Sequence, residues 1–231
     1  MPPIVLHTTY FGSVDWYRQL ICAEGDVYID ADENYVKQTT RNRCEIATAN
    51  GKQMLSVPVS IPPSFRRGMG RGCSIREVLV SEHGNWRHQH WEALKSAYGM
   101  SPFFDYYQDD IRPFFDEEVF KANDWQRLFD YNLAIMRKML DLIGIEKKIK
   151  DPLQLPLKGG ETTLDVGTED ILKAVPEAAT VRDLPPLRGT GGGLYYQTFQ
   201  RRHGFIPGLS ILDLLFNEGP EAILYLKPMD N

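Results

Sequence analysis

The sequence has no long apolar stretch, and this absence limits where the protein can reside. No run of apolar residues approaches the ~20 that a membrane-spanning helix needs. The first residues, MPPIVLHTTYFG, carry no cationic start and only one short apolar run, so we expect no secretion signal. The sequence therefore favours a cytoplasmic protein without membrane insertion.

Cysteine is also scarce, and the three that occur are Cys22, Cys44 and Cys73. Their odd number and wide spacing favour reduced thiols over a disulfide framework. No CxxC pair occurs, which excludes a zinc ribbon. The GxSxG motif of hydrolases and the GxGxxG motif of dinucleotide-binding proteins are absent as well. Of the three thiols, only Cys73 lies near arginines that are expected to lower its pKa.

Positive charge is not in excess over the whole chain. The formal net charge is -5, which argues against bulk attraction to nucleic acid or to an anionic membrane. Apolar material is ample, because 42% of the 231 residues are hydrophobic and 11% are aromatic. This composition predicts a globular protein with one large domain, or one domain and a small appendage.

The N-terminal pattern is that of a strand, a helix and a second strand. Ile4–Leu6 and Val27–Ile29 are short β-prone runs, and Ser13 is placed to cap a helix between them. This order predicts a βαβ-like start.

A β-hairpin is the clearest local prediction. Within residues 43–59, two β-prone runs flank Asn50-Gly51, a pair typical of a type I′ turn. Pro58 is expected to end the second strand early. A further strand is predicted over residues 75–80.

Helical periodicity dominates the following part of the chain. Apolar spacing predicts helices over residues 85–98, 102–115 and 124–143, the last of them capped by Asp124 and ended by Gly144. The predicted fold class is therefore mixed α/β, with a βαβ-like start, a β-hairpin and a largely helical second half.

The texture of the sequence changes at residues 149–193, which are rich in Gly, Pro and Thr and contain no aromatic residue. We interpret this stretch as a linker that is partly disordered. Residues 1–148 are then the main α/β domain, and residues 194–231 form a helical segment that packs back onto it, because a segment of that size cannot bury enough surface alone. Ser210 and Asp213 have the spacing of a capping box ahead of an apolar run.

A basic segment is the first candidate for chemistry. Residues 35–80 have a net charge of +6 within an acidic protein. Arginine binds phosphate or carboxylate with two parallel hydrogen bonds, so this segment can be a phosphate site. The alternative is a solvated loop whose arginines pair with acidic residues, and we favour it for Arg66, Arg67 and Arg71. For Arg41 and Arg43, which begin the hairpin, we favour the functional reading.

A histidine-rich stretch, SEHGNWRHQHW, is the second candidate. On a helix His88 and His90 point about 200° apart, so they cannot share one metal ion, and no metal is predicted. His90 suits a general base, because the pKa of histidine lies near neutrality. The alternative is a structural histidine that bonds to backbone beside Trp91.

The third candidate is FFDYYQDD, in which Asp105 and Asp109 share a helix face next to Tyr106 and Tyr107. Carboxylates and aromatic rings together can hold a sugar. The alternative, an amphipathic helix with an exposed acidic face, is the better interpretation.

Four segments together resemble the WbqC-like family of surface-polysaccharide and O-antigen clusters. They are TTYFGSVDWY, ENYVKQTTRNRCEIATANGKQMLSVPV, NWRHQHWEALKSAYGMSPFFDYY and YYQTFQRRHGFIPGLSILDLLFNEGPEA. The chain departs from many relatives at its start, where it has Thr8-Thr9 in place of a Gln-Pro pair and Gly12 in place of a proline. This departure leaves His7 without an assigned role.

The resemblance implies an acyl- or aminoacyl (glycyl) transferase that modifies a sugar in surface-polysaccharide biosynthesis. Its partners would be a nucleotide-sugar or lipid-linked glycan precursor and an acyl or aminoacyl donor, and the question of a cofactor stays open. The motif residues have these expected roles: His90 as general base, Asn42 orienting the acyl group, and Lys37, Arg41, Arg43, Trp91 and Tyr98 binding substrate, with Tyr98 better explained by packing.

Two other classes of function stay open. The first is a non-enzymatic protein that docks partners in a glycan assembly complex. The second is binding of a tRNA-linked donor, against which the acidic net charge counts. Convergence of the three candidate clusters in one cavity would favour the enzyme.

Overall fold

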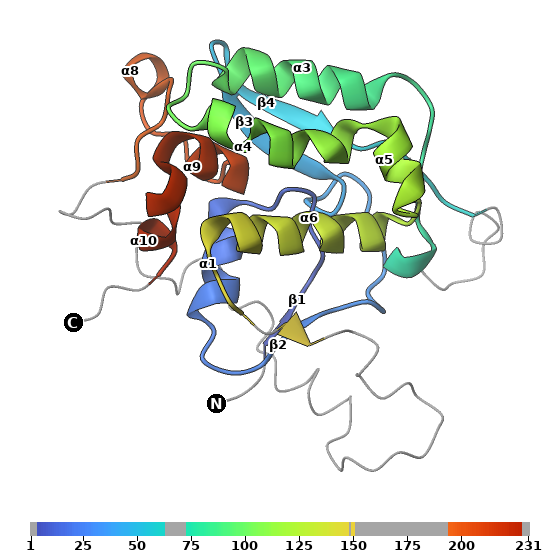
Figure 1. The fold of residues 1–231 in the computed structure, drawn as a ribbon. Helices are drawn as coiled ribbons and strands as arrows, with labels where there is room; N and C mark the ends of the chain where they lie inside the picture. The colour runs from blue at the N-terminus through green and yellow to red at the C-terminus, as the bar shows by residue number, and fades with distance from the viewer. Residues whose placement is uncertain (1–3, 63–72, 148, 151–193, 228–231) are drawn as a thin grey trace.

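The computed structural model describes residues 4–62, 73–147, 149–150 and 194–227. The predicted linker lies outside these ranges except for its first two residues, as do Arg66, Arg67 and Arg71. The architecture is mixed α/β with a helical second half, as predicted (Figure 1). The proposed domain boundaries remain a prediction.

The chain begins with the predicted βαβ unit. Strand β1 (Ile4–Leu6) pairs in parallel with β2 (Val27–Ile29), and helix α1 (Val14–Cys22) connects them. The Ser13 side chain caps α1 by accepting a hydrogen bond from the Trp16 amide. Strand β7 (Ile149–Lys150) adds a third parallel strand next to β2.

The predicted hairpin is confirmed, but the prediction of a type I′ turn is wrong. Strands β3 (Arg43–Thr48) and β4 (Gly51–Ser56) are antiparallel, with Thr48 opposite Gly51. A type I′ turn needs a positive φ at both central residues. The two residues between the paired positions are Ala49 and Asn50, and neither has a positive φ; the positive φ of 102° belongs to Gly51, the residue that follows them.

The strand predicted over residues 75–80 is shorter than expected. Its first half is a 3₁₀ turn, η1 (Ile75–Glu77), because the Ser74 hydroxyl accepts a hydrogen bond from the Arg76 amide and offers the backbone a local alternative. The second half is β6 (Leu79–Val80), which pairs with β5 (Val59–Ser60).

Helices form the middle of the chain. In this part they are α3 (Trp86–Tyr98), α4 (Phe104–Ile111), α5 (Glu117–Ala122) and α6 (Leu128–Ile143), with the 3₁₀ turn η2 (Arg112–Phe115) after α4. Figure 1 shows α3 at the top, α6 across the middle and the small parallel sheet at the bottom. None of the helices within the described ranges is both long and apolar enough to cross a bilayer.

The ends of α6 confirm one prediction and correct another. Gly144 ends the helix in the left-handed conformation, with a φ of 74°. Asp124 does not cap it, because the helix begins at Leu128 and Asp124 itself has a φ of 53°. Asp116 instead caps α5, a helix that the sequence pattern did not predict.

The C-terminal segment lies against the N-terminal half. It contains α8 (Gln200–His203), α9 (Ile211–Glu218), η5 (Gly219–Glu221) and α10 (Ala222–Leu226). Helix α9 contacts α1, α4 and β3, and α10 contacts α1. In Figure 1 the red C-terminal helices accordingly lie beside the blue α1.

A buried carboxylate anchors this segment. The Tyr195 hydroxyl donates to Asp213 Oδ2 at 2.8 Å, and Gln197 donates to the Tyr195 hydroxyl at 2.9 Å. Asp213 therefore does not complete a capping box, and the Ser210 amide donates instead to the Glu45 carbonyl. Burial raises the pKa of Asp213 to about 6, although hydrogen bonds from Tyr195, Tyr98 and Gln197 oppose the shift.

This carboxyl group makes stability depend on pH in a defined direction. The folded state holds its proton up to about pH 6, whereas the ordinary pKa is 3.8, so its contribution to the free energy of unfolding falls as pH rises through that window. We expect the unfolding free energy of the wild type minus that of Asp213→Asn to fall as the pH is raised from 4 to 6. Urea titrations at several pH values measure it, and a difference that rises with pH contradicts the assignment.

Candidate functional site

A cavity of about 560 Å³, here called the main cavity, lies where three segments meet. Its walls come from residues 7–13, residues 38–45 and residues 208–210, with Met54 of β4 at the side. It thus combines the end of β1, the start of β3 and the turn before α9.

Hydrogen bonds between backbone segments hold these walls together. The Tyr10 amide donates to the Thr40 carbonyl at 3.0 Å, and the Ser210 hydroxyl donates to the Phe11 carbonyl at 2.8 Å. A Cβ at Gly12 would lie 2.5 Å from Thr9 Cγ2, so any larger residue here would force the buried Thr9 side chain to move.

Two residues of the cavity wall have a backbone conformation that non-glycine residues rarely adopt. Phe11 has a φ of 40° and Gln38 a φ of 61°. Such strain persists only where the surroundings enforce it, and it is concentrated at functional sites. The backbone conformation therefore marks this cavity as the candidate site.

His7 is the residue that the sequence interpretation missed. It follows β1 directly and lines the main cavity, with its Nε2 3.0 Å from the Thr40 hydroxyl. Burial, and then the charge of Arg41, lower its pKa to about 4, so the ring is neutral at pH 7. The signal that could have found it is its position at the carboxyl end of a parallel strand, where ligands often bind.

The two arginines predicted to bind an anion both line the cavity but differ in their partners. Arg41 donates through Nε and Nη2 to Oε2 of Glu33, whose side chain is 8% exposed. Arg43 makes no ion pair within the described ranges, and its Nε has no hydrogen-bond partner there. The guanidinium of Arg43 is therefore available to bind a ligand, whereas that of Arg41 stabilises the cavity wall through its ion pair with Glu33.

Asn42 and Lys37 line an adjoining hollow of about 390 Å³, which shares Gln38 with the main cavity. The Asn42 amide donates to the Val57 carbonyl at 2.9 Å, and its Oδ1 is buried without a partner among the described residues. Lys37 is exposed. The structure thus places these two predicted residues beside the main cavity and not in it.

His90 occupies a buried position on α3. Its side chain is 6% exposed, and its Nδ1 lies 2.9 Å from the Tyr10 hydroxyl. Rings of Tyr10, Trp86 and Phe115 surround it, and burial lowers its pKa to about 4. The inward face of α3 includes His90 and Leu94, so the ring faces the interior, and the role of His90 as a general base stays a prediction.

The other two predicted residues of α3 differ in exposure. Trp91 is half-buried and lines a third cavity, away from the main one. Tyr98 is fully buried, and its hydroxyl accepts a hydrogen bond from the Ala47 amide at 3.1 Å. The packing interpretation of Tyr98 agrees with this position.

The three candidate clusters of the sequence do not converge in one cavity. Arg43 lines the main cavity, His88 lines the cavity beside Trp91, and Asp109 lines a shallow hollow between α4 and α6. The thiol prediction is also corrected, because burial and then Glu77 raise the pKa of Cys73. A catalytic proposal can therefore combine Arg43 with residues of the main cavity and of the hollow that adjoins it, but not with His88 or Asp109.

A model of the WbqC-like protein family matches residues 9–225, and the chain belongs to this family. The chain is also 29% identical over 225 residues to Rv1507c, an uncharacterized protein of Mycobacterium tuberculosis, with 91% of each chain covered. No solved structure matches. The family match includes all three walls of the main cavity, although His7 precedes it.

The different partners of the two arginines predict different costs of removal. Arg41→Ala leaves the Glu33 carboxylate buried without its partner, and we expect the free energy of unfolding to fall by about 3 kcal/mol. Arg43→Ala, the matched control, should cost about 1 kcal/mol or less. Urea denaturation measures both, and the double variant Glu33→Gln/Arg41→Ala should recover most of the loss. Equal losses in the two single variants contradict the assignment.

Proposed function

We propose that the protein transfers an acyl or aminoacyl group to a sugar of a surface-polysaccharide precursor, with the main cavity as its reaction site. The single observation that carries this proposal is that Arg43, which pairs with no carboxylate among the described residues, lines the same cavity as the neutral His7. Membership of the WbqC-like family supports the choice of glycan.

In this proposal Arg43 holds the phosphate or carboxylate of a substrate through paired hydrogen bonds. Lys37 and Asn42 hold the acyl donor in the adjoining hollow, where Asn42 Oδ1, which has no partner in the described part of the chain, accepts from an amine or hydroxyl of that donor. Gln38, common to both walls, separates the two substrates.

The reaction is nucleophilic substitution at an acyl carbon. A hydroxyl or amine of the sugar attacks the carbonyl carbon, and a new C–O or C–N bond forms as the bond to the donor's leaving group breaks. With Nε2–H donating to Thr40, His7 Nδ1 accepts the proton of the attacking group. The leaving group departs with the bonding electrons and receives that proton.

A pKa of about 4 makes His7 a weak base, and a bound anion would raise that pKa and make His7 a stronger base. A negative charge beside the ring offsets the effect of Arg41 and raises the pKa of His7. We expect pyrophosphate to shift the His7 titration measured by NMR to higher pH in the wild type but not in Arg43→Ala. The ring signals of His203, an exposed histidine outside the main cavity, serve as the control and should not change with pyrophosphate at fixed pH in either protein. A His7 titration unaffected by pyrophosphate contradicts anion binding beside this ring.

The test of the function itself is the mass of the glycan. Deleting the gene from its host should remove an acyl or aminoacyl group from the surface polysaccharide, seen by mass spectrometry. Complementation with His7→Gln should restore roughly 10²–10⁴-fold less transfer per molecule, the usual contribution of positioned proton transfer.

His90→Gln is the matched control, since it replaces a histidine with a similar pKa that lies outside the main cavity. It should lower the melting temperature and leave transfer per folded molecule nearly intact. Loss of transfer in His90→Gln but not in His7→Gln contradicts the assignment of His7 and indicates that His90 is the general base. Less polysaccharide of unchanged mass after deletion supports the docking alternative instead.

A further inference from the structure

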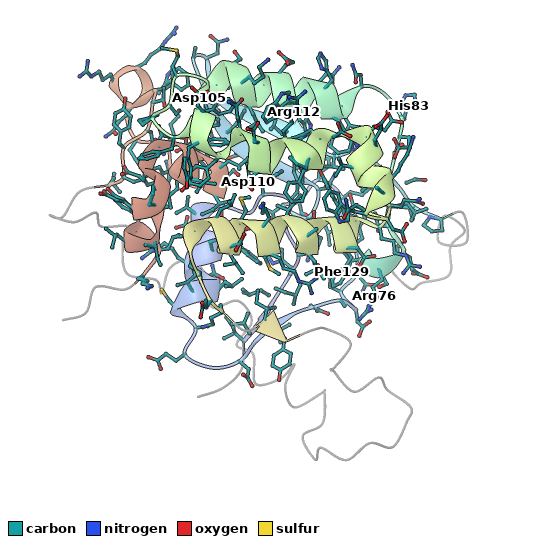
Figure 2. The ribbon with its side chains drawn as sticks, in the orientation of Figure 1. Arg76, His83, Asp105, Asp110, Arg112 and Phe129 are labelled. Carbon is teal, nitrogen blue, oxygen red and sulfur yellow. The ribbon has the colours of Figure 1, made fainter. Side chains whose placement is uncertain are left out.

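The third cavity, which Trp91 lines, has a volume of about 390 Å³ and lies at the start of α3, close to η2 and α5. We call it the tryptophan hollow, and its lining includes Glu82, Arg87, His88, Trp91, Arg112 and Glu117. Arg112 is labelled in Figure 2, beside α3 and α4. The proposed transfer reaction does not use this hollow.

Trp91 supplies an aromatic surface to the hollow, and two neighbouring rings hold it in place. Its ring stacks on Phe104 with centroids 6.0 Å apart, and it also contacts Phe115 at 5.9 Å. The side chain is half-buried, and its indole N–H makes no hydrogen bond to the described part of the chain. A half-buried indole with an unused donor suits a ligand with one apolar face and one polar edge.

Arg87 makes the rim of the hollow rigid. Its guanidinium lies 4.0 Å from the Phe120 ring centroid and 4.6 Å from that of Trp86. It donates to both carboxylate oxygens of Glu82, at 2.9 and 3.0 Å. Glu82 is thus fixed as an acceptor at the mouth of the hollow.

The charges around the hollow balance. Glu82, Asp116 and Glu117 oppose Arg87, Arg112 and Lys121. Arg112 is exposed and makes no ion pair with any described residue. A balanced field does not favour phosphate, whereas many donors and acceptors around an indole favour a polyhydroxylated, uncharged ligand.

We propose that the tryptophan hollow binds a neutral pyranose residue of the glycan, stacked on Trp91 and hydrogen-bonded by Glu82 and Arg112. The choice of a glycan rests on the proposed function. The rings of Phe11 and Phe115, stacked 5.9 Å apart, separate this hollow from the main cavity. The sugar held here is therefore a recognition unit and not the residue that reacts.

Saturation-transfer NMR of the full chain with the methyl glycosides of glucose, galactose and N-acetylglucosamine tests this inference. We expect saturation of the ring protons of at least one glycoside, with a Kd on the order of 1–10 mM. Trp91→Ala and Arg112→Gln should each weaken binding at least about fivefold. Because Arg112 is exposed, its variant keeps the test valid even if Trp91→Ala fails to fold.

Trp125→Phe is the matched control, since Trp125 lines a different hollow and should leave binding unchanged. The inference is overturned if no glycoside is saturated, if neither variant weakens binding, or if inorganic phosphate competes with the sugar. Binding is measured without a donor, so it persists even where no group is transferred. A chain that modifies its glycan but binds none of these sugars overturns this inference alone.

Discussion

The structure depends on the contact that Ser210 makes with two distant segments. Its hydroxyl donates to the Phe11 carbonyl, and its amide donates to the Glu45 carbonyl. On either side, the Val14 amide donates to Leu209 and the Ile211 amide donates to Gly12. These bonds connect the N-terminal βαβ unit, the hairpin and the C-terminal helices at one point. The main cavity is the space that remains between them.

The same contact explains how Phe11 keeps an unfavourable backbone angle. Its carbonyl is fixed by Ser210, and its ring packs edge-on against Phe114 and flat against Phe115. A residue held at both backbone and side chain cannot relax without breaking several contacts at once. The wall of the cavity is therefore rigid before any ligand arrives, which lowers the entropic cost of binding.

Much of the fold was predictable because its signals are local. Ser13 caps α1 and Gly144 ends α6 through residues within one helical turn, so spacing alone indicates them. The site was predictable only in part. Arg43 was found from charge, but His7 meets it through strand order and tertiary packing, which no short motif encodes. The burial of His90 depends on the packing of α3 against Tyr10 and Phe115, which the neighbouring residues in the sequence do not reveal.

The distance along the chain between the walls of the cavity has a consequence for synthesis. Phe11 and Ser210 are 199 positions apart, and the Cys22 thiol bonds to the Leu226 carbonyl over 204 positions. A ribosome releases the first two walls long before the third, because chains are made from the N-terminus at ≈ 5–20 residues per second. Nascent chains and products of premature termination therefore lack a finished ligand site. The third wall of the main cavity is not in place until translation has passed Ser210.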